Sequence, residues 1–160
     1  MKSEILGNIY LLYRSHVIVL IMYVVLCCLC TAVAIGVVKF RLLDTRVKCI
    51  AVLLTVCIGD VILLGWRIKE LIPVYADYKE SSYVILEDVT MTVSDKQSYH
   101  GFGLNSLNAT HKVVAVDGEG NSYDLIIRQS HWDFDFSHDY TGTLVYLKHS
   151  GHVVWYDVDL

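Results

Sequence analysis

The sequence predicts a membrane α-helical hairpin of two transmembrane helices, followed by a small, mostly antiparallel all-β domain that is a sandwich or a partly closed barrel. Three observations predict this fold class. Two long apolar runs lie before residue 70, apolar and polar residues alternate beyond residue 83, and charges divide unequally between these two parts. With 54% hydrophobic and 19% charged residues, the 160-residue chain is more apolar than an average soluble domain.

The first apolar run, residues 17–38, holds 22 residues without a charge, between His16 and Lys39. At about 1.5 Å per residue, a helix of this length crosses a hydrocarbon core of about 30 Å. The apolar region of a cleaved signal peptide is only about 7–15 residues long. We therefore expect a transmembrane helix, preceded by an N-terminal tail at residues 1–16.

The second apolar run, residues 49–69, carries Asp60 as its only charge before Arg67. Trp66 suits the membrane–water interface, and Pro73 is expected to stop the helix. The short connection makes the two spans antiparallel neighbours in a hairpin over residues 17–70. Residues 71–82 are then a linker, and residues 83–160 form the β-rich domain.

Small side chains recur at every fourth position of both spans, which lets helix backbones approach closely. The two stripes mirror each other about the connecting loop, so an antiparallel hairpin places them at matching depths. Chance spacing is the alternative, because small residues are common in membrane helices. The expected packing residues are Cys28, Ala32 and Gly36 in the first span, and Ala51, Thr55 and Gly59 in the second.

Asp60 is the main polar candidate in the membrane part. A carboxylate at the bilayer centre costs roughly 2.5–3.5 kcal/mol, and less toward a helix end. We expect Asp60 to form a contact in a homo-oligomer, with a hydrogen bond from Thr31, Thr55 or a second Asp60 of another copy, or to line an ion pathway. A tolerated, protonated carboxyl is the alternative.

The density of basic residues predicts the orientation of the hairpin. The loop between the spans carries Lys39, Arg41, Arg46 and Lys48. Basic loops remain in the cytoplasm, so we expect a multi-pass protein of the cell membrane whose β domain is extracytoplasmic.

About six strands are expected in the β domain, because apolar and polar residues alternate in short runs separated by glycine-bearing turns. Ser150-Gly151 is expected to be a two-residue hairpin turn. This turn would place Val145, Leu147, Val154, Tyr156 and Val158 on the core face. The expected strands are residues 83–93, 111–117, 122–128, 131–137, 143–149 and 152–158.

Charge restricts the partners of the domain. From Pro73 onward there are thirteen acidic and five basic residues, a net charge near −8. Such a domain repels polyanions, so we expect no nucleic-acid partner. All five cysteines lie in the two apolar runs, which excludes a disulfide framework or a cysteine zinc site in the domain.

Two histidine-containing groups are candidate metal sites. His131, Asp133, Asp135 and His138 bring imidazole and carboxylate groups together at strand spacing, which suits a divalent cation. The alternative is a solvated acidic strand face. His149 and His152 flank the expected turn, where they bind metal, titrate near pH 6, or are simply exposed.

The sequence contains no P-loop, glycine-rich dinucleotide turn, HExxH, CxxC or GxSxG motif. We therefore expect no catalytic residues, no cofactor and no enzyme activity. The expected role is a membrane protein that presents an acidic β domain to a protein partner, or senses one, beside the bilayer.

The layout of two N-terminal membrane helices and a β-rich domain resembles the two-transmembrane β-rich effectors of bacterial cyclic-nucleotide antiphage defence systems. It also resembles small bacterial membrane proteins that end in a β-hairpin such as YTGTLVYLKHSGHVVWY. The first resemblance implies a ligand-gated membrane effector. That function requires basic groups converging on a pocket, and the domain supplies only Lys79, Lys96, Lys112, Arg128 and Lys148.

Overall fold

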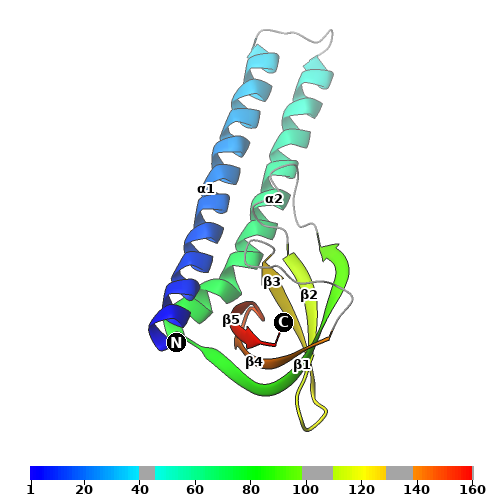
Figure 1. The fold of residues 1–160 in the computed structure, drawn as a ribbon. Helices are drawn as coiled ribbons and strands as arrows, with labels where there is room; N and C mark the ends of the chain where they lie inside the picture. The colour runs from blue at the N-terminus through cyan, green and yellow to red at the C-terminus, as the bar shows by residue number, and fades with distance from the viewer. Residues whose placement is uncertain (40–45, 99–109, 129–138, 160) are drawn as a thin grey trace. The chain divides into compact units, whose positions relative to one another are not determined.

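The computed structural model describes residues 1–39, 46–98, 110–128 and 139–159 (Figure 1). They form two compact units. One unit holds residues 11–75, which include most of both helices. The other holds residues 1–10 and 76–160, which include the start of the first helix, the end of the second and the whole sheet.

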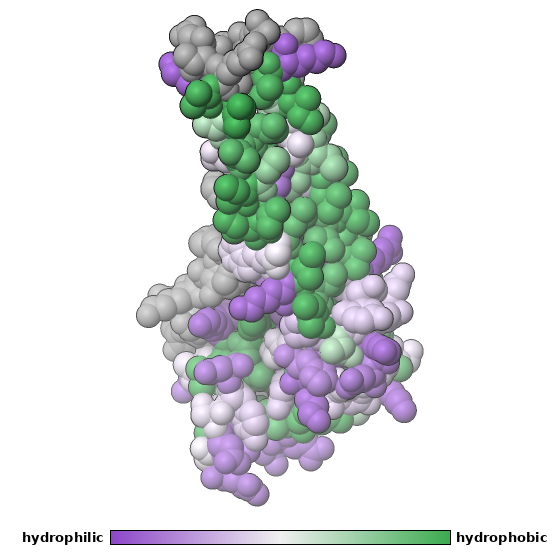
Figure 2. Space-filling model, turned by 180° about the vertical axis from the view of Figure 1, so that it is seen from behind, coloured by the Kyte–Doolittle hydropathy of each residue, from purple (hydrophilic) through white to green (hydrophobic). Residues whose placement is uncertain are grey.

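Helix α1 spans Lys2–Lys39 and helix α2 spans Arg46–Glu80. Both are long and apolar enough to cross a membrane, as expected. On the face that Figure 2 shows, apolar side chains cover the helices along much of their length. Polar side chains gather on the surface of the sheet.

Both helices extend beyond the expected spans. Residues 1–16 are not a tail, because α1 already begins at Lys2. Ile5 and Ile9 lie one turn apart on one helix face and are buried, which explains why this segment is helical.

Pro73 does not stop α2, and the expected linker is helical up to Glu80. A proline inside a helix costs about 3 kcal/mol. Packing of the residues that follow offsets this cost: Val74 is fully buried, and the ring of Tyr75 lies 5.9 Å from that of Tyr13.

The five described strands form one antiparallel sheet in the order β3-β2-β1-β4-β5 (Figure 1). Five of the six expected strands are confirmed. The sixth, expected at residues 131–137, lies outside the described residues. The bounds are β1 Tyr83–Ser98, β2 Thr110–Val116, β3 Ser122–Arg128, β4 Asp139–Leu147 and β5 Val153–Val158.

The central strand β1 bends at a β-bulge. Its register against β4 shifts between Leu86 and Val89, and Asp88 has a positive φ of 55°. The extra residue sharpens the local twist and lets the long strand curl with its neighbours.

The main core lies on one face of the sheet. It consists of Val89, Met91, Val113, Ala115, Leu125, Ile127, Tyr140 and Leu144, with Tyr156 and Val158 packed against it. Val145 and Leu147 are also fully buried but do not belong to this cluster. The expected shared face was therefore wrong: Tyr156 and Val158 face the main core with Leu144, the cross-strand partner of Tyr156.

The β4–β5 connection explains this difference. The N–H of Leu147 donates to the carbonyl of His152 at 2.9 Å, and the N–H of Gly151 donates to the carbonyl of Leu147 at 2.9 Å. Residues 148–151 therefore make a four-residue turn rather than a two-residue turn at Ser150-Gly151. A second shift follows at Val154, which has no partner in the β4 register.

Candidate functional site

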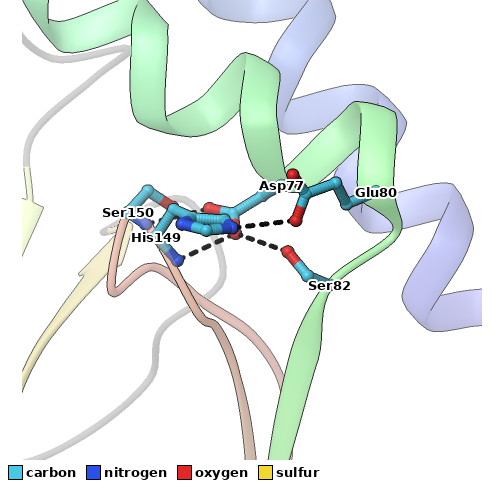
Figure 3. Close-up of polar contacts among 5 residues, drawn as sticks. All are labelled: Asp77, Glu80, Ser82, His149 and Ser150. Atoms are coloured by element: carbon cyan, nitrogen blue, oxygen red, sulfur yellow. Dashed lines mark hydrogen bonds and ion pairs between the residues drawn. The ribbon is translucent and has the colours of Figure 1, made fainter.

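The strongest cluster of polar contacts among the described residues lies where helix α2 ends and the sheet begins (Figure 3). All of its residues belong to the unit that contains the sheet. Asp77, in the last turn of α2, is fully buried although it carries a carboxylate. A buried charge is costly unless its oxygens are hydrogen-bonded, so its partners decide what the residue does.

The carboxylate of Asp77 binds the β4–β5 turn through two backbone N–H groups. The N–H of His149 donates to Oδ1 at 2.9 Å, and the N–H of Ser150 donates to Oδ2 at 2.9 Å. The hydroxyl of Ser82 donates to Oδ1 at 3.1 Å. Both carboxylate oxygens of Asp77 thus accept hydrogen bonds. Asp77 of α2 provides the acceptors for two N–H groups of the turn that have no acceptor within the turn.

The backbone of the helix end is equally well defined. The N–H of Ser82 donates to the carbonyl of Asp77 at 3.1 Å, and Ser81 has a positive φ of 51°. This is a Schellman-type helix end, with serine at the left-handed position that glycine usually occupies. Strand β1 starts at Tyr83, so only Ser81 and Ser82 separate helix from strand.

The side chain of His149 approaches Glu80, one turn or less from Asp77. Its Nε2 lies 3.1 Å from Oε2 of Glu80, and the two side chains are 38% and 61% exposed. At that exposure the pair is solvated and adds little to stability. His149 and His152 do not flank a tight turn, because His149 lies within the four-residue turn.

Helix α1 reaches the same hairpin from its own end. The side-chain N–H of Asn8 donates to the carbonyl of Val154 at 2.8 Å. Val154 is the residue left unpaired by the register shift in β5, so its carbonyl needs a donor outside the ladder. Both long helices therefore bond to the β4–β5 hairpin, α1 through Asn8 and α2 through Asp77.

The turn between β2 and β3 is closed by a second acidic residue. The carboxylate of Asp117 accepts from the backbone N–H groups of Glu119 and Asn121, from the Asn121 side chain and from the hydroxyl of Tyr123. The side-chain hydrogen bond from Asn121 is the largest cause that lowers the pKa of Asp117. The Asp117 carboxylate in turn raises the pKa of Tyr123.

In the helical unit, Asp60 has a partner within its own chain. The hydroxyl of Thr31 donates to Oδ2 of Asp60 at 2.8 Å, across the two helices. The buried thiol of Cys27 is another hydrogen-bonding neighbour of Asp60. The hydrogen bond from Thr31, expected from another copy, is thus made within one chain.

The small-residue stripes face outward where the structure describes them. Cys28, Ala32, Ala51 and Thr55 are exposed, and a methyl group added at Gly36 or Gly59 would meet nothing within 4 Å. The residues between the helices are instead Tyr23, Cys27, Thr31 and Ala34 of α1, which are buried or half-buried. The stripes do not pack the two helices of one hairpin together.

Arg67 joins the helices about two turns beyond Asp60. Its guanidinium donates to Glu70 at 2.7 Å and to the hydroxyl of Tyr23 at 2.9 Å, and lies 4.5 Å from the centre of the Tyr23 ring. Trp66, the residue before Arg67, is 44% exposed.

The proposed metal ligands His131, Asp133, Asp135 and His138 lie outside the described residues. Within residues 1–39, 46–98, 110–128 and 139–159, no group of three or more histidine, cysteine or acidic side chains is placed to hold a metal ion. Sequence reasoning missed Asp77 because its turn partners are 72 and 73 residues away along the chain. No local pattern connects residues at that separation.

Comparison with known proteins gives no further assignment. No protein family, no curated protein and no solved structure matches the chain.

Proposed function

We propose that this is a non-enzymatic integral membrane protein whose acidic β domain binds or senses a partner beside the bilayer. The observation that carries the proposal is the junction at Asp77. Helix α2 passes into β1 through two residues, and its buried carboxylate holds the β4–β5 turn. A domain fixed to a membrane helix in this way can pass a change in its shape to the helix end, whereas a domain on a flexible tether cannot.

The charge of the domain indicates the kind of partner. Acidic side chains are exposed on several strands and turns, whereas the exposed basic side chains described there are Lys79, Lys112 and Lys148. Complementary charge steers association and selects among partners. A protein with a basic surface is therefore the favoured partner. The exposed acids are Glu80, Glu87, Asp88, Glu119, Asp124, Asp139, Asp157 and Asp159.

For the fold we favour a partly closed barrel over a sandwich. The N–H of Ile126 in β3 donates to the carbonyl of Gly151 at 2.9 Å, and Ile126 forms a parallel bridge with His152. This contact joins β3, one outer strand of the sheet, to the two residues that precede β5, the other outer strand. A curled sheet whose outer strands meet is the start of a closed barrel.

We also propose that the domain lies outside the cytoplasm, since the loop between the helices is rich in basic residues. A topology reporter fused after Leu160 tests this placement. A reporter active only outside the cytoplasm should be active. Activity of a cytoplasmic reporter at the same position would show that the domain lies in the cytoplasm and would contradict the proposed orientation.

Self-association through the helices remains part of the proposal. Its support is the outward-facing small residues, since they leave a shallow surface on which a second hairpin can pack closely. Asp60 is no longer needed for that contact.

A ligand-gated membrane effector is the alternative function. The fixed helix–sheet junction would serve gating, which favours it. The required convergence of basic groups lacks support, because the three cationic side chains described in the domain are exposed and solvated. The partner-binding function therefore stands first.

Site-specific photo-crosslinking in native membranes tests the proposed function. A photoreactive residue is placed at Ser122, two residues from Asp124 on the same strand face. We expect an adduct with a protein partner that weakens at high salt and in Asp124→Lys, but not in the matched reversal Lys112→Glu. An adduct insensitive to both salt and Asp124→Lys would contradict the acidic surface as the binding determinant.

A further inference from the structure

The turn that Asp77 holds is also the place where the two outer strands of the sheet meet. Asp77 binds the N–H groups of His149 and Ser150, and the next residue, Gly151, accepts the N–H of Ile126 through its carbonyl. Three consecutive residues thus connect helix α2 on one side with strand β3 on the other. This connection does not depend on what the domain binds.

We propose that Asp77 acts as a latch that couples the end of helix α2 to closure of the sheet between β3 and β5. With its carboxylate seated on the turn, the carbonyl of Gly151 is held where Ile126 can donate to it. When the carboxylate leaves the turn, the two N–H groups lose their acceptors, the turn relaxes, and the β3–β5 contact opens.

The geometry of the turn supports this transmission. Gly151 adopts a φ of 68°, in the left-handed region, and its N–H is held by the carbonyl of Leu147 at 2.9 Å. The direction of the Gly151 carbonyl is therefore fixed by the turn conformation. Among described residues, the parallel bridge of Ile126 in β3 is with His152, the residue just before β5, so a change of the turn acts directly on this bridge.

The reverse direction follows from the same contacts. A partner that pulls β3 away from β5 would remove the acceptor of Ile126 and disturb the turn residues that Asp77 binds. Coupling between two such contacts is reciprocal by thermodynamic necessity. Movement at the outer strands would thus reach the last turn of α2 without passing through the core.

Asp77→Asn is the sharpest variant because it keeps the shape of the side chain. The asparagine has one acceptor oxygen, so its NH₂ group must face the N–H of either His149 or Ser150. The matched control is Glu80→Gln, which changes a carboxylate in the same turn of α2 that touches the His149 side chain but not the turn backbone. A second control, Ser82→Ala, removes the third donor to Asp77 and leaves the turn contacts in place.

Amide hydrogen exchange of the full chain in lipid nanodiscs tests the latch. In Asp77→Asn we expect exchange of the Ile126 amide to accelerate at least about tenfold, together with the His149 and Ser150 amides. The Val113 amide of strand β2 should exchange in Asp77→Asn as slowly as in the unmutated protein. In Glu80→Gln, the Ile126, His149 and Ser150 amides should also keep the exchange rates of the unmutated protein. Acceleration at His149 and Ser150 with unchanged exchange at Ile126 would overturn the proposal.

If Asp77→Asn fails to fold, the unmutated protein decides the question. Native-state exchange at increasing denaturant shows which amides open together. The latch requires the amides of Ile126, His149 and Ser150 to open in one event, with the same free energy and the same denaturant dependence. Separate openings of Ile126 and the turn would exclude the coupling.

Discussion

Thr31 and Asp60 lie on different helices, and the hydroxyl of Thr31 donates a 2.8 Å hydrogen bond to the carboxylate of Asp60. Each helix on its own carries a polar side chain that apolar surroundings solvate poorly. In the hairpin each supplies the partner of the other. The pair therefore explains how a chain with a carboxylate in an apolar span can form a stable two-helix hairpin.

Thr31→Val should destabilise the hairpin by about 0.6–2 kcal/mol, the range measured for polar contacts between membrane helices. Valine keeps the size of threonine and removes only the donor. Thr55→Val is the matched control, because the Thr55 hydroxyl is exposed and donates to Ala51 of its own helix. Reversible unfolding in bilayers measures both. Equal losses in the two variants would mean that the contact with Asp60 contributes nothing specific.

Asp117 should make the domain sensitive to acid. Its pKa is lowered, first by the hydrogen bond from the Asn121 side chain. Because the folded pKa lies below the unfolded value near 3.8, the contribution is complete above that value and is lost as pH falls through the folded pKa. The melting temperature should fall below about pH 4, with a shallower slope in Asp117→Asn. If the melting temperature fell with the same slope in Asp117→Asn and the unmutated protein, Asp117 would not contribute to the acid response. Asp124→Asn is the control for loss of a carboxylate.

Tyr123 should act in the opposite direction at high pH. The Asp117 carboxylate raises the pKa of its hydroxyl above the usual value of 10.0. A raised folded pKa gives a contribution that is complete below the unfolded value and is lost as pH rises through the folded one. Spectrophotometric titration should therefore find one tyrosine, absent in Tyr123→Phe, that ionises later in the folded domain than in the unfolded chain.

Gly142→Ala should lower the free energy of unfolding of the domain by about 1–3 kcal/mol, the typical cost of forcing an extra methyl group into a close contact. A methyl group at Gly142 would clash with the carbonyl oxygen of Asp157 and lie 2.7 Å from Cα of Val158. Gly118→Ala is the control, because a methyl group there meets nothing within 4 Å. Chemical denaturation compares the two. If Gly142→Ala left the free energy of unfolding unchanged, β5 would lie farther from β4 than the structure shows.

The element types could be predicted from the sequence, whereas the junctions between them could not. Apolar run length and alternation identified both helices and five strands. Pro73 was misread because the burial of Val74 and the contact of Tyr75 with Tyr13 are tertiary effects that outweigh local preference. The β4–β5 turn was misread for the same reason, since Asp77 binds its N–H groups from 72 and 73 residues away.

The sequence identified Asp60 as the polar residue to explain, but not its partner within the chain. Spacing showed the small-residue stripes, yet it could not show which way they face. For α1, that direction depends on which side of the helix carries Tyr23, Cys27 and Thr31. Tyr23 and Thr31 are held by Arg67 and Asp60 of α2.

The outward stripes give a test of self-association. Ala32→Leu should reduce crosslinked oligomers in membranes, because a larger side chain prevents close approach of a second hairpin. Val33→Leu is the control, since Val33 is 68% exposed and already large. Detection of only monomer for the unmutated chain would refute association through the helices.

The central claim is that the end of helix α2 and the β domain form one body, joined by Asp77. Electron–electron distance measurements test it most directly, with spin labels at the exposed positions Lys79 and Glu119 in a chain whose native cysteines are replaced. We predict a single narrow distance distribution for the parent protein and a broader one in Asp77→Asn. A broad distribution in the parent protein itself would contradict the account, because it would mean that the domain moves freely on its helix.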